Sequence, residues 1–205
     1  MRTLAIIGTA GGVGVSTLAA LARSVTRSDP QGPSRLLARD GTVLPVHGAG
    51  DDLAANGPNG AIRDGAHSTI WDAGAQTPSA AVDLLQTAGV TLVLVAPSTP
   101  LGSADARCLL DHVVSVDDTL LPRVALVQNG VYGRHRGGWA RNITPSIILH
   151  WPYDRALARS GGEPHDPATL SRRSRHALSA FHRYCTFVLR RAPAGPAVSG
   201  DWTPR

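Results

Sequence analysis

An α/β fold with one doubly wound, mostly parallel sheet and helices on both faces is the architecture that the sequence predicts. Short apolar runs alternate along the chain with longer stretches of helical periodicity, which is the order of a parallel sheet with crossover helices. The central runs are almost entirely apolar, as expected of strands that helices cover on both faces. A length of 205 residues suits a single domain that buries a core.

The first predicted strand is the apolar run Thr3–Ile7, and a glycine-rich turn joins it to a helix over Gly14–Thr26. Right-handed crossovers between units of this kind place successive strands in one parallel sheet. Thr3–Ile7 should lie centrally, because its loop must open at the edge where ligands bind. The remaining elements are expected as strands over Ser34–Ala38, Thr69–Trp71, Thr91–Ala96, Arg123–Gln128 and Ser146–Leu149, and as helices over Ser79–Ala88, Ser103–Ser115 and Thr169–Arg191.

Two segments depart from this pattern. Residues 40–68 (Asp40–Ser68) are rich in Gly, Asn, Pro and Asp and have little periodicity, which predicts mostly loop. The Pro- and Gly-rich stretch Ala192–Arg205 is expected to be a disordered tail. The sequence therefore predicts one domain over residues 1–191 followed by this tail.

The composition is basic in an unusual way. All 20 basic residues are arginine, and the net charge of +5 favours an acidic partner such as nucleic acid or a membrane surface. GC-rich coding would produce the same arginine, alanine and glycine usage without selection for binding. Cys108 and Cys185 are interpreted as two buried, reduced thiols. No signal peptide is evident and no apolar run is long enough to span a membrane, so we expect a cytoplasmic protein.

The strongest motif is the segment from Ile6 to Thr17, which reads IIGTAGGVGVST. A strand, a glycine turn and a helix start direct several backbone N–H groups toward one point, where the helix dipole favours an anion. Ser16 and Thr17 stand where a phosphate-binding loop places its magnesium-binding hydroxyl. Val15 occupies the position of that loop's lysine. The alternative is an ordinary tight strand-to-helix turn of an α/β fold.

This segment resembles the deviant Walker A loop of the ParA/MinD family of P-loop ATPases. The family has lysine at the positions of Ala10 and Val15: the first reaches across a dimer interface, and the second binds phosphate within the subunit. The resemblance implies ATP or ADP with Mg²⁺ as ligand, weakly bound here, and leaves a homodimer open. The residues implied to bind the nucleotide are Gly11, Gly12, Val13, Gly14, Val15, Ser16, Thr17 and Asn129.

Later segments are similar to other motifs of that family, in the same order along Thr3–Arg191. The run TIWDAG is similar to the Walker B strand and places Asp72 where, with Ser16, it would hold magnesium. The run VALVQNG is similar to the strand whose final asparagine, Asn129 here, contacts adenine. The run IILHWPYD is similar to the strand and Pro-x-Asp turn before the family's last helix.

Three of these polar residues have structural alternatives. Asp40 is the nearest candidate for a second catalytic aspartate, but Asp followed by Gly is a common turn pair. Asp72 is interpreted either as a magnesium ligand or as a strand-end acid that caps the next helix. For Asn129 the turn interpretation is slightly favoured, because Asn-Gly is itself a strong turn signal.

Two basic clusters remain. The segment Arg134–Arg141 combines arginines with Trp139, which suits phosphate contact or a solvated surface loop. The last predicted helix has an apolar stripe that should pack on the sheet. Its arginines would then face solvent and contact DNA or lipid. The stripe comprises Leu170, Ala177, Leu178, Phe181, Tyr184, Cys185 and Val188, and the arginines are Arg172, Arg173, Arg175, Arg183, Arg190 and Arg191.

Three functions fit these observations, and the first is preferred. A pseudo-ATPase or adaptor would keep the loop, lack efficient hydrolysis and bind a protein partner. An active nucleotide switch would need an arginine in place of the lysine, with Arg39, Arg63 or Arg134 as candidates. A basic module would bind nucleic acid through its last helix. The histidines have no metal-ligand spacing, and no serine-hydrolase motif occurs.

Overall fold

The computed structural model describes residues 2–26, 35–40, 42, 68–132, 145–159 and 167–190. Most of the predicted 40–68 loop, the Arg134–Arg141 segment, Arg63, Arg191 and the tail lie outside the described residues. The six strands are β1 (Arg2–Gly8), β2 (Arg35–Leu37), β3 (Ser68–Ala75), β4 (Val90–Pro97), β5 (Val124–Asn129) and β6 (Ile147–Trp151). The helices are α1 (Val15–Thr26), α2 (Pro78–Gln86), α3 (Pro100–Val116), α4 (Arg155–Arg159) and α5 (Arg172–Arg190), with 3-10 turns η2 (Asp118–Arg123) and η3 (Pro167–Thr169).

The strands form one sheet in the order β2-β3-β1-β4-β5-β6, and every neighbouring pair is parallel. This confirms the predicted α/β class and the central position of Thr3–Ile7. β1 pairs with β3 on one side and β4 on the other, so the loop after β1 opens between the carboxyl ends of these strands. Side chains that follow β3, β4 and β5 therefore reach the same edge of the sheet.

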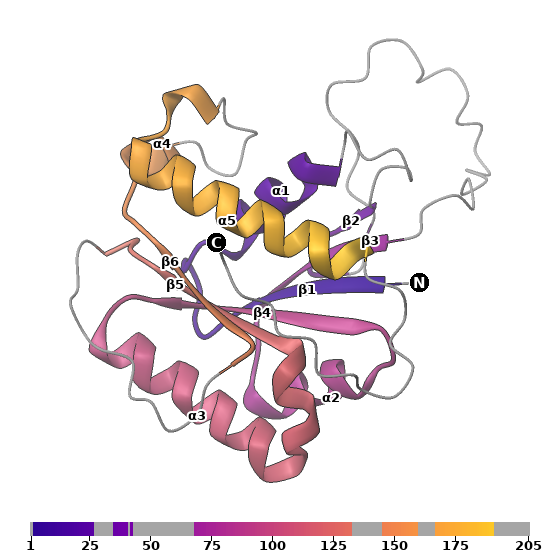
Figure 1. The fold of residues 1–205 in the computed structure, drawn as a ribbon. Coiled ribbons are helices and arrows are strands. Elements are labelled where there is room, and N and C mark those ends of the chain that lie inside the picture. The colour runs from indigo at the N-terminus through magenta and orange to yellow at the C-terminus, as the bar shows by residue number, and fades with distance from the viewer. Residues whose placement is uncertain are drawn as a thin grey trace, which may run out of the picture.

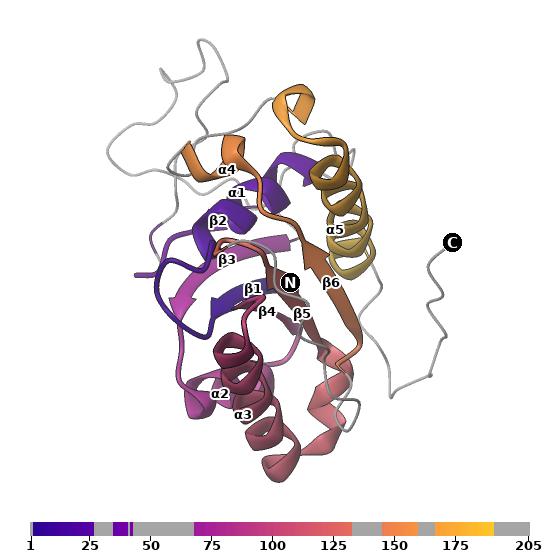
Figure 2. The same ribbon diagram turned by 90° about the vertical axis from the view of Figure 1, so that its left-hand side faces the viewer.

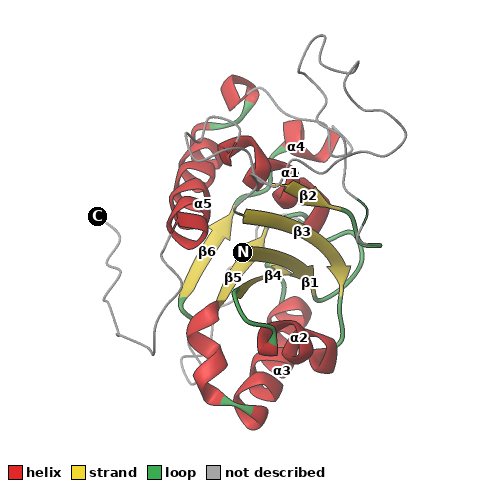
Figure 3. Ribbon diagram, turned by 90° about the vertical axis from the view of Figure 1, so that its right-hand side faces the viewer, coloured by secondary structure: helices red, strands yellow, loops and turns green. Residues whose placement is uncertain are grey.

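Helices cover both faces of the sheet (Figure 1). One core contains Leu4 and Ile6 of β1 together with buried residues of α1 and α5. The other contains Ala5 and Ile7 with residues of α2 and α3. Successive side chains of β1 therefore point alternately into the two cores, as expected of a strand that is buried on both faces. The side views separate the α1, α4 and α5 layer from the α2 and α3 layer (Figures 2 and 3).

Helix boundaries differ from the prediction where a side chain caps the backbone. Thr77 and Thr99 accept hydrogen bonds from Ala80 N (3.3 Å) and Gly102 N (3.0 Å), so α2 and α3 begin at the prolines that follow. α5 begins at Arg172 rather than Thr169, because the Ser171 hydroxyl accepts from Ser174 N. The short α4 and η2 were not predicted.

The apolar stripe of α5 packs in the core as expected. Phe181 is fully buried, and its ring meets Trp151 of β6 edge to face with the ring centroids 5.9 Å apart. The prediction of two buried thiols is half wrong. Cys185 is buried, and burial raises its thiol pKa, but Cys108 is exposed because α3 turns Ala106, Leu109 and Leu110 toward the sheet instead.

The two helical layers differ in charge. Helices α1, α4 and α5 contain one, two and five arginines, eight in all, and no acidic residue. The elements α2, α3 and η2 contain four aspartates and two arginines. No helix among the described residues is long and apolar enough to cross a membrane.

Candidate functional site

The glycine loop, residues Thr9–Gly14, connects β1 to α1 by a tight turn. Gly12 and Gly14 have φ angles of +73° and +94°, which only glycine adopts without strain. Ideal Cβ atoms on Gly11 and Gly12 would meet nothing within 4 Å, so the loop is open beside these two residues. The loop leads directly into the N-terminus of α1, where Leu18 N donates to Gly14 O. This backbone matches the strand, turn and helix start that the sequence predicts.

Val13 and Val15 fill the inner side of the loop. Their side chains are 0% and 7% exposed and belong to the core beneath α1. An ideal Cβ on Gly8 would lie 2.7 Å from a Val13 methyl group and 2.8 Å from a Val15 methyl group. The residue at the lysine position is thus part of an apolar contact at the end of β1. The anion site expected above this contact stays a prediction.

Asn129 holds the loop from the far side. It is the last residue of β5, is 8% exposed, and its Nδ2 donates to Val13 O at 2.9 Å. An ideal Cβ on Gly14 would lie only 2.6 Å from the same nitrogen. Asn129 therefore lies in a strand rather than in the slightly favoured turn, and its amide joins segments 116 residues apart. Gly130 is required by close packing, since a Cβ there would meet Tyr153 N at 2.7 Å.

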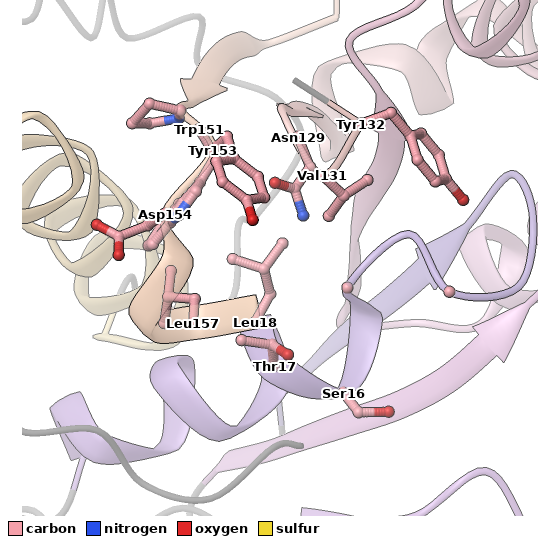
Figure 4. A pocket seen from close by; sticks show the side chains of 13 residues that line it. Ser16, Thr17, Leu18, Asn129, Val131, Tyr132, Trp151, Tyr153, Asp154 and Leu157 are labelled. Carbon is pink, nitrogen blue, oxygen red and sulfur yellow. The ribbon is translucent and has the colours of Figure 1, made fainter. Parts of the chain in front are cut away.

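A cavity of about 350 Å³ opens between the loop, α1 and the ends of β5 and β6. Figure 4 shows Leu18, Asn129 and Tyr153 grouped around it, whereas the Ser16 hydroxyl is turned away from them. Tyr132 and Tyr153 are 67% and 50% exposed at its rim. None of the lining residues that the structure describes is basic. The full lining is Gly12, Gly14, Ser16, Thr17, Leu18, Asn129, Val131, Tyr132, Trp151, Pro152, Tyr153, Asp154 and Leu157.

Asp154 stabilises the backbone beside this cavity. Its carboxylate accepts hydrogen bonds from Ala156 N and Ser171 N, each at 2.9 Å, and so ties the turn after β6 to the start of α5. Burial raises the pKa of this carboxyl, but hydrogen bonds from Ser174, Ser171 and Ala156 outweigh burial and hold it below its usual value. Asp154 is thus ionised at neutral pH, and a negative group borders the cavity.

Asp72 and Asp40 lie outside the cavity. Asp72 is half-buried in β3, and its Oδ1 accepts from Gly74 N at 3.2 Å. The helix-cap alternative is wrong, because Thr77 caps α2. Asp40 accepts from Thr42 N (3.0 Å) and Thr42 Oγ1 (2.7 Å) in an exposed turn, and these bonds lower its pKa. A magnesium site on Ser16 and Asp72 stays a prediction. No cluster of three or more metal-binding side chains occurs among the described residues.

The structure thus brings together Gly12, Gly14, Ser16, Thr17 and Asn129 of the predicted binding residues, while Val13 and Val15 face the core. Sequence reasoning missed Leu18, Val131, Tyr132 and Leu157. Val131 and Tyr132 come shortly after a predicted strand. Their place at the carboxyl edge of the sheet, where ligands bind, could have identified them from the sequence.

The described lining of the cavity is poor in positive charge. Among the described residues, the lining supplies backbone N–H groups, the hydroxyls of two aliphatic and two tyrosine side chains and one carboxylate, but no cation. A polyanion that moved from water into this cavity would lose solvation, and the described groups would compensate for only part of that loss. No family model matches the chain, and no curated protein is similar to it.

Proposed function

We propose that this protein is a ParA/MinD-like pseudo-ATPase that works by binding a protein partner, with weak or no nucleotide hydrolysis. Val15 carries the proposal: at the position of the phosphate-binding lysine, it is 7% exposed and packed on Val13 beside Gly8. The chain has no lysine to take its place.

The argument is electrostatic. Enzymes that transfer phosphoryl groups act chiefly by positioning and by stabilising charge on the transferred group. Removing one preorganised charge-stabilising donor commonly lowers the rate about a hundredfold or more. Here both positions that carry lysine in the family, Ala10 and Val15, are apolar. Backbone amides, the Ser16 hydroxyl and Mg²⁺ held with Asp72 would support weak ATP or ADP binding without efficient hydrolysis.

Calorimetry with ATP and ADP in the presence of Mg²⁺, together with a steady-state ATPase assay, tests the proposal. The native protein should bind weakly or not at all and should not turn over ATP. Val15→Lys should tighten ATP binding by about tenfold or more, since hydrogen bonds to charged groups contribute roughly 1.5–3 kcal/mol. Val15→Ala is the matched control and should add no affinity. Turnover by the native protein at rates typical of lysine-bearing relatives would contradict the proposal.

Arg39 supports a second candidate, an active switch with arginine in place of lysine. Arg39 is exposed at the end of β2, and its Cδ lies 3.0 Å from an ideal Cβ on Gly74. Trp71 Nε1 donates to Ala38 O at 3.0 Å and fixes the end of β2 against β3. A forked side chain beside β3, the strand next to β1, would be long enough to reach toward the loop from outside.

The two candidates separate on one substitution. In the pseudo-ATPase, Arg39→Gln leaves the absence of ATPase activity unchanged. In the switch, ATPase activity is present and Arg39→Gln removes it, while Arg107→Gln on α3 does not.

A further inference from the structure

The exposed face of α5 concentrates positive charge. Arginines at five positions of this helix are exposed, and the helix contains no acidic residue: Arg172, Arg173, Arg175, Arg183 and Arg190. Three of them fall within its first four residues. Cations there oppose the helix macrodipole, which favours negative charge at an N-terminus. The nearby Asp154 carboxylate offsets only part of this charge and is already bound to backbone N–H groups.

The opposite face of α5 is apolar and packs on the sheet. Leu178, Phe181, Tyr184, Cys185 and Leu189 are buried against the sheet. The apolar stripe is therefore buried in the core. The helix has no second apolar face that could insert into a lipid surface. Of the eight acidic residues that the structure describes, five lie in or beside α2, α3 and η2, in the layer across the sheet from α5.

One aromatic side chain interrupts the charged face. Phe187 is 37% exposed, and it lies four residues after Arg183 and three before Arg190. Residues at these spacings share one face of a helix. Arginines flanking an exposed aromatic ring are the combination with which proteins hold unpaired nucleic acid, because the cations contact phosphates and the ring stacks on a base.

We propose that the exposed face of α5 binds single-stranded nucleic acid, with its arginines on the phosphates and Phe187 stacked on a base. Duplex is the weaker ligand, because its bases are already paired and stacked and cannot use the ring. The acidic layer across the sheet disfavours binding on the opposite side of the molecule. The inference goes beyond the proposed function and does not depend on the glycine loop, so it stands whether or not nucleotide binds there.

The test is fluorescence anisotropy of the full chain with a labelled single strand of about 16 nucleotides, with the matching duplex as competitor. We expect single-strand binding that weakens linearly with the logarithm of salt concentration, with a slope of about −0.7 per phosphate contact. Replacing Arg172, Arg175 and Arg183 together by glutamine should reduce that slope by about 2. Phe187→Leu should weaken binding about tenfold and leave the slope unchanged, since stacking carries no charge.

Arg107→Gln on α3 is the matched control, because it removes an exposed arginine from the other layer and should leave binding unchanged. Circular dichroism and the melting temperature show whether each variant folds. Equal affinity for duplex, an equal effect of Arg107→Gln, or no single-strand binding at low salt would each overturn the proposal. Binding to vesicles rich in anionic lipid without oligonucleotide binding would assign the face to a membrane instead and would also overturn it.

Discussion

The glycine loop leads into α1 and α5 packs beside α1, but the loop and the exposed face of α5 combine geometry and charge in opposite ways. The loop has the backbone of an anion site, with two glycines at positive φ and a helix N-terminus, and its inner side is apolar. The exposed face of α5 has five arginines on a regular helix that forms no enclosed cradle. The loop thus has the backbone expected of an anion site but no cation among its described lining residues, whereas α5 has the cations on an open surface.

The difference follows from where each side chain lies. At position 15 a lysine would bring a cation into a site that is only 7% exposed, which is costly unless an anion is bound there. Valine removes that cost and packs on Val13. Exposed arginines on α5 keep their charged ends in water and so lose little solvation. A charged side chain is therefore more costly at position 15 than on the exposed face of α5.

The largest expected effect contrasts the two faces of α5. Phe181→Ala should destabilise the protein by roughly 3–5 kcal/mol, because it empties a fully buried site against Trp151. Arg183→Gln, on the exposed face, should change stability by less than about 0.5 kcal/mol. Urea unfolding midpoints measure both. Similar losses from the two substitutions would show that the arginine face is also structural.

The loop can be tested in the same way with two alanines. Gly14→Ala should cost roughly 2–4 kcal/mol, since it combines a positive φ with a Cβ 2.6 Å from Asn129 Nδ2. Gly11→Ala is the matched control: a Cβ there meets nothing within 4 Å, and the effect should stay within about 0.5 kcal/mol. Equal midpoints for the two variants would mean that the loop is not held in this conformation.

The contact that ties the loop to the sheet should have an intermediate effect. Asn129→Asp keeps the shape of the side chain but removes the donor and sets a carboxylate against Val13 O. We expect a loss of roughly 1–3 kcal/mol in unfolding free energy. Tyr132→Phe, at the exposed rim of the same cavity, should be nearly neutral. A neutral Asn129→Asp would show that the loop does not depend on β5.

The elements that sequence reasoning predicted are those with a strong local signal. Apolar runs such as Leu92–Val95 and the glycines between Ile7 and Val15 define strands and the loop wherever they occur. The short α4 and η2 elements have too few residues for a periodicity to be visible. The turn before α4 also depends on a contact outside the segment, the hydrogen bond that Ser171 N donates to Asp154.

The site was less predictable than the fold, because its contacts join distant segments. Nothing near Asn129 in the sequence indicates that its amide reaches Val13, 116 residues earlier. The same holds for the cavity, whose two tyrosines follow different strands and line one cavity only because the strand ends share an edge of the sheet. That the loop contains no lysine is visible in the sequence, but the burial of Val15 could be known only from its packing beside Gly8 and Val13.

The smallest expected effect concerns pH at the contact between α1 and α5. Burial lowers the pKa of His182 below its ordinary value of 6.5, against a smaller raising effect of the hydrogen bond to the backbone of Leu21. Its Nε2 is buried without a partner, so a proton added there would be poorly solvated. The unfolded chain then binds more protons than the folded one as pH falls through 6.5, and the contribution of His182 to stability declines below that pH.

Unfolding midpoints at pH 7.5 and at about pH 5 measure this difference for the native protein and for His182→Gln. The variant should lose less stability on acidification, because it has no group to protonate at that position. His176→Gln is the control, since His176 lies on the same helix but is exposed, and it should keep the native pH dependence. If His182→Gln and the native protein lose equal stability, the packing of α1 on α5 is insensitive to this imidazole.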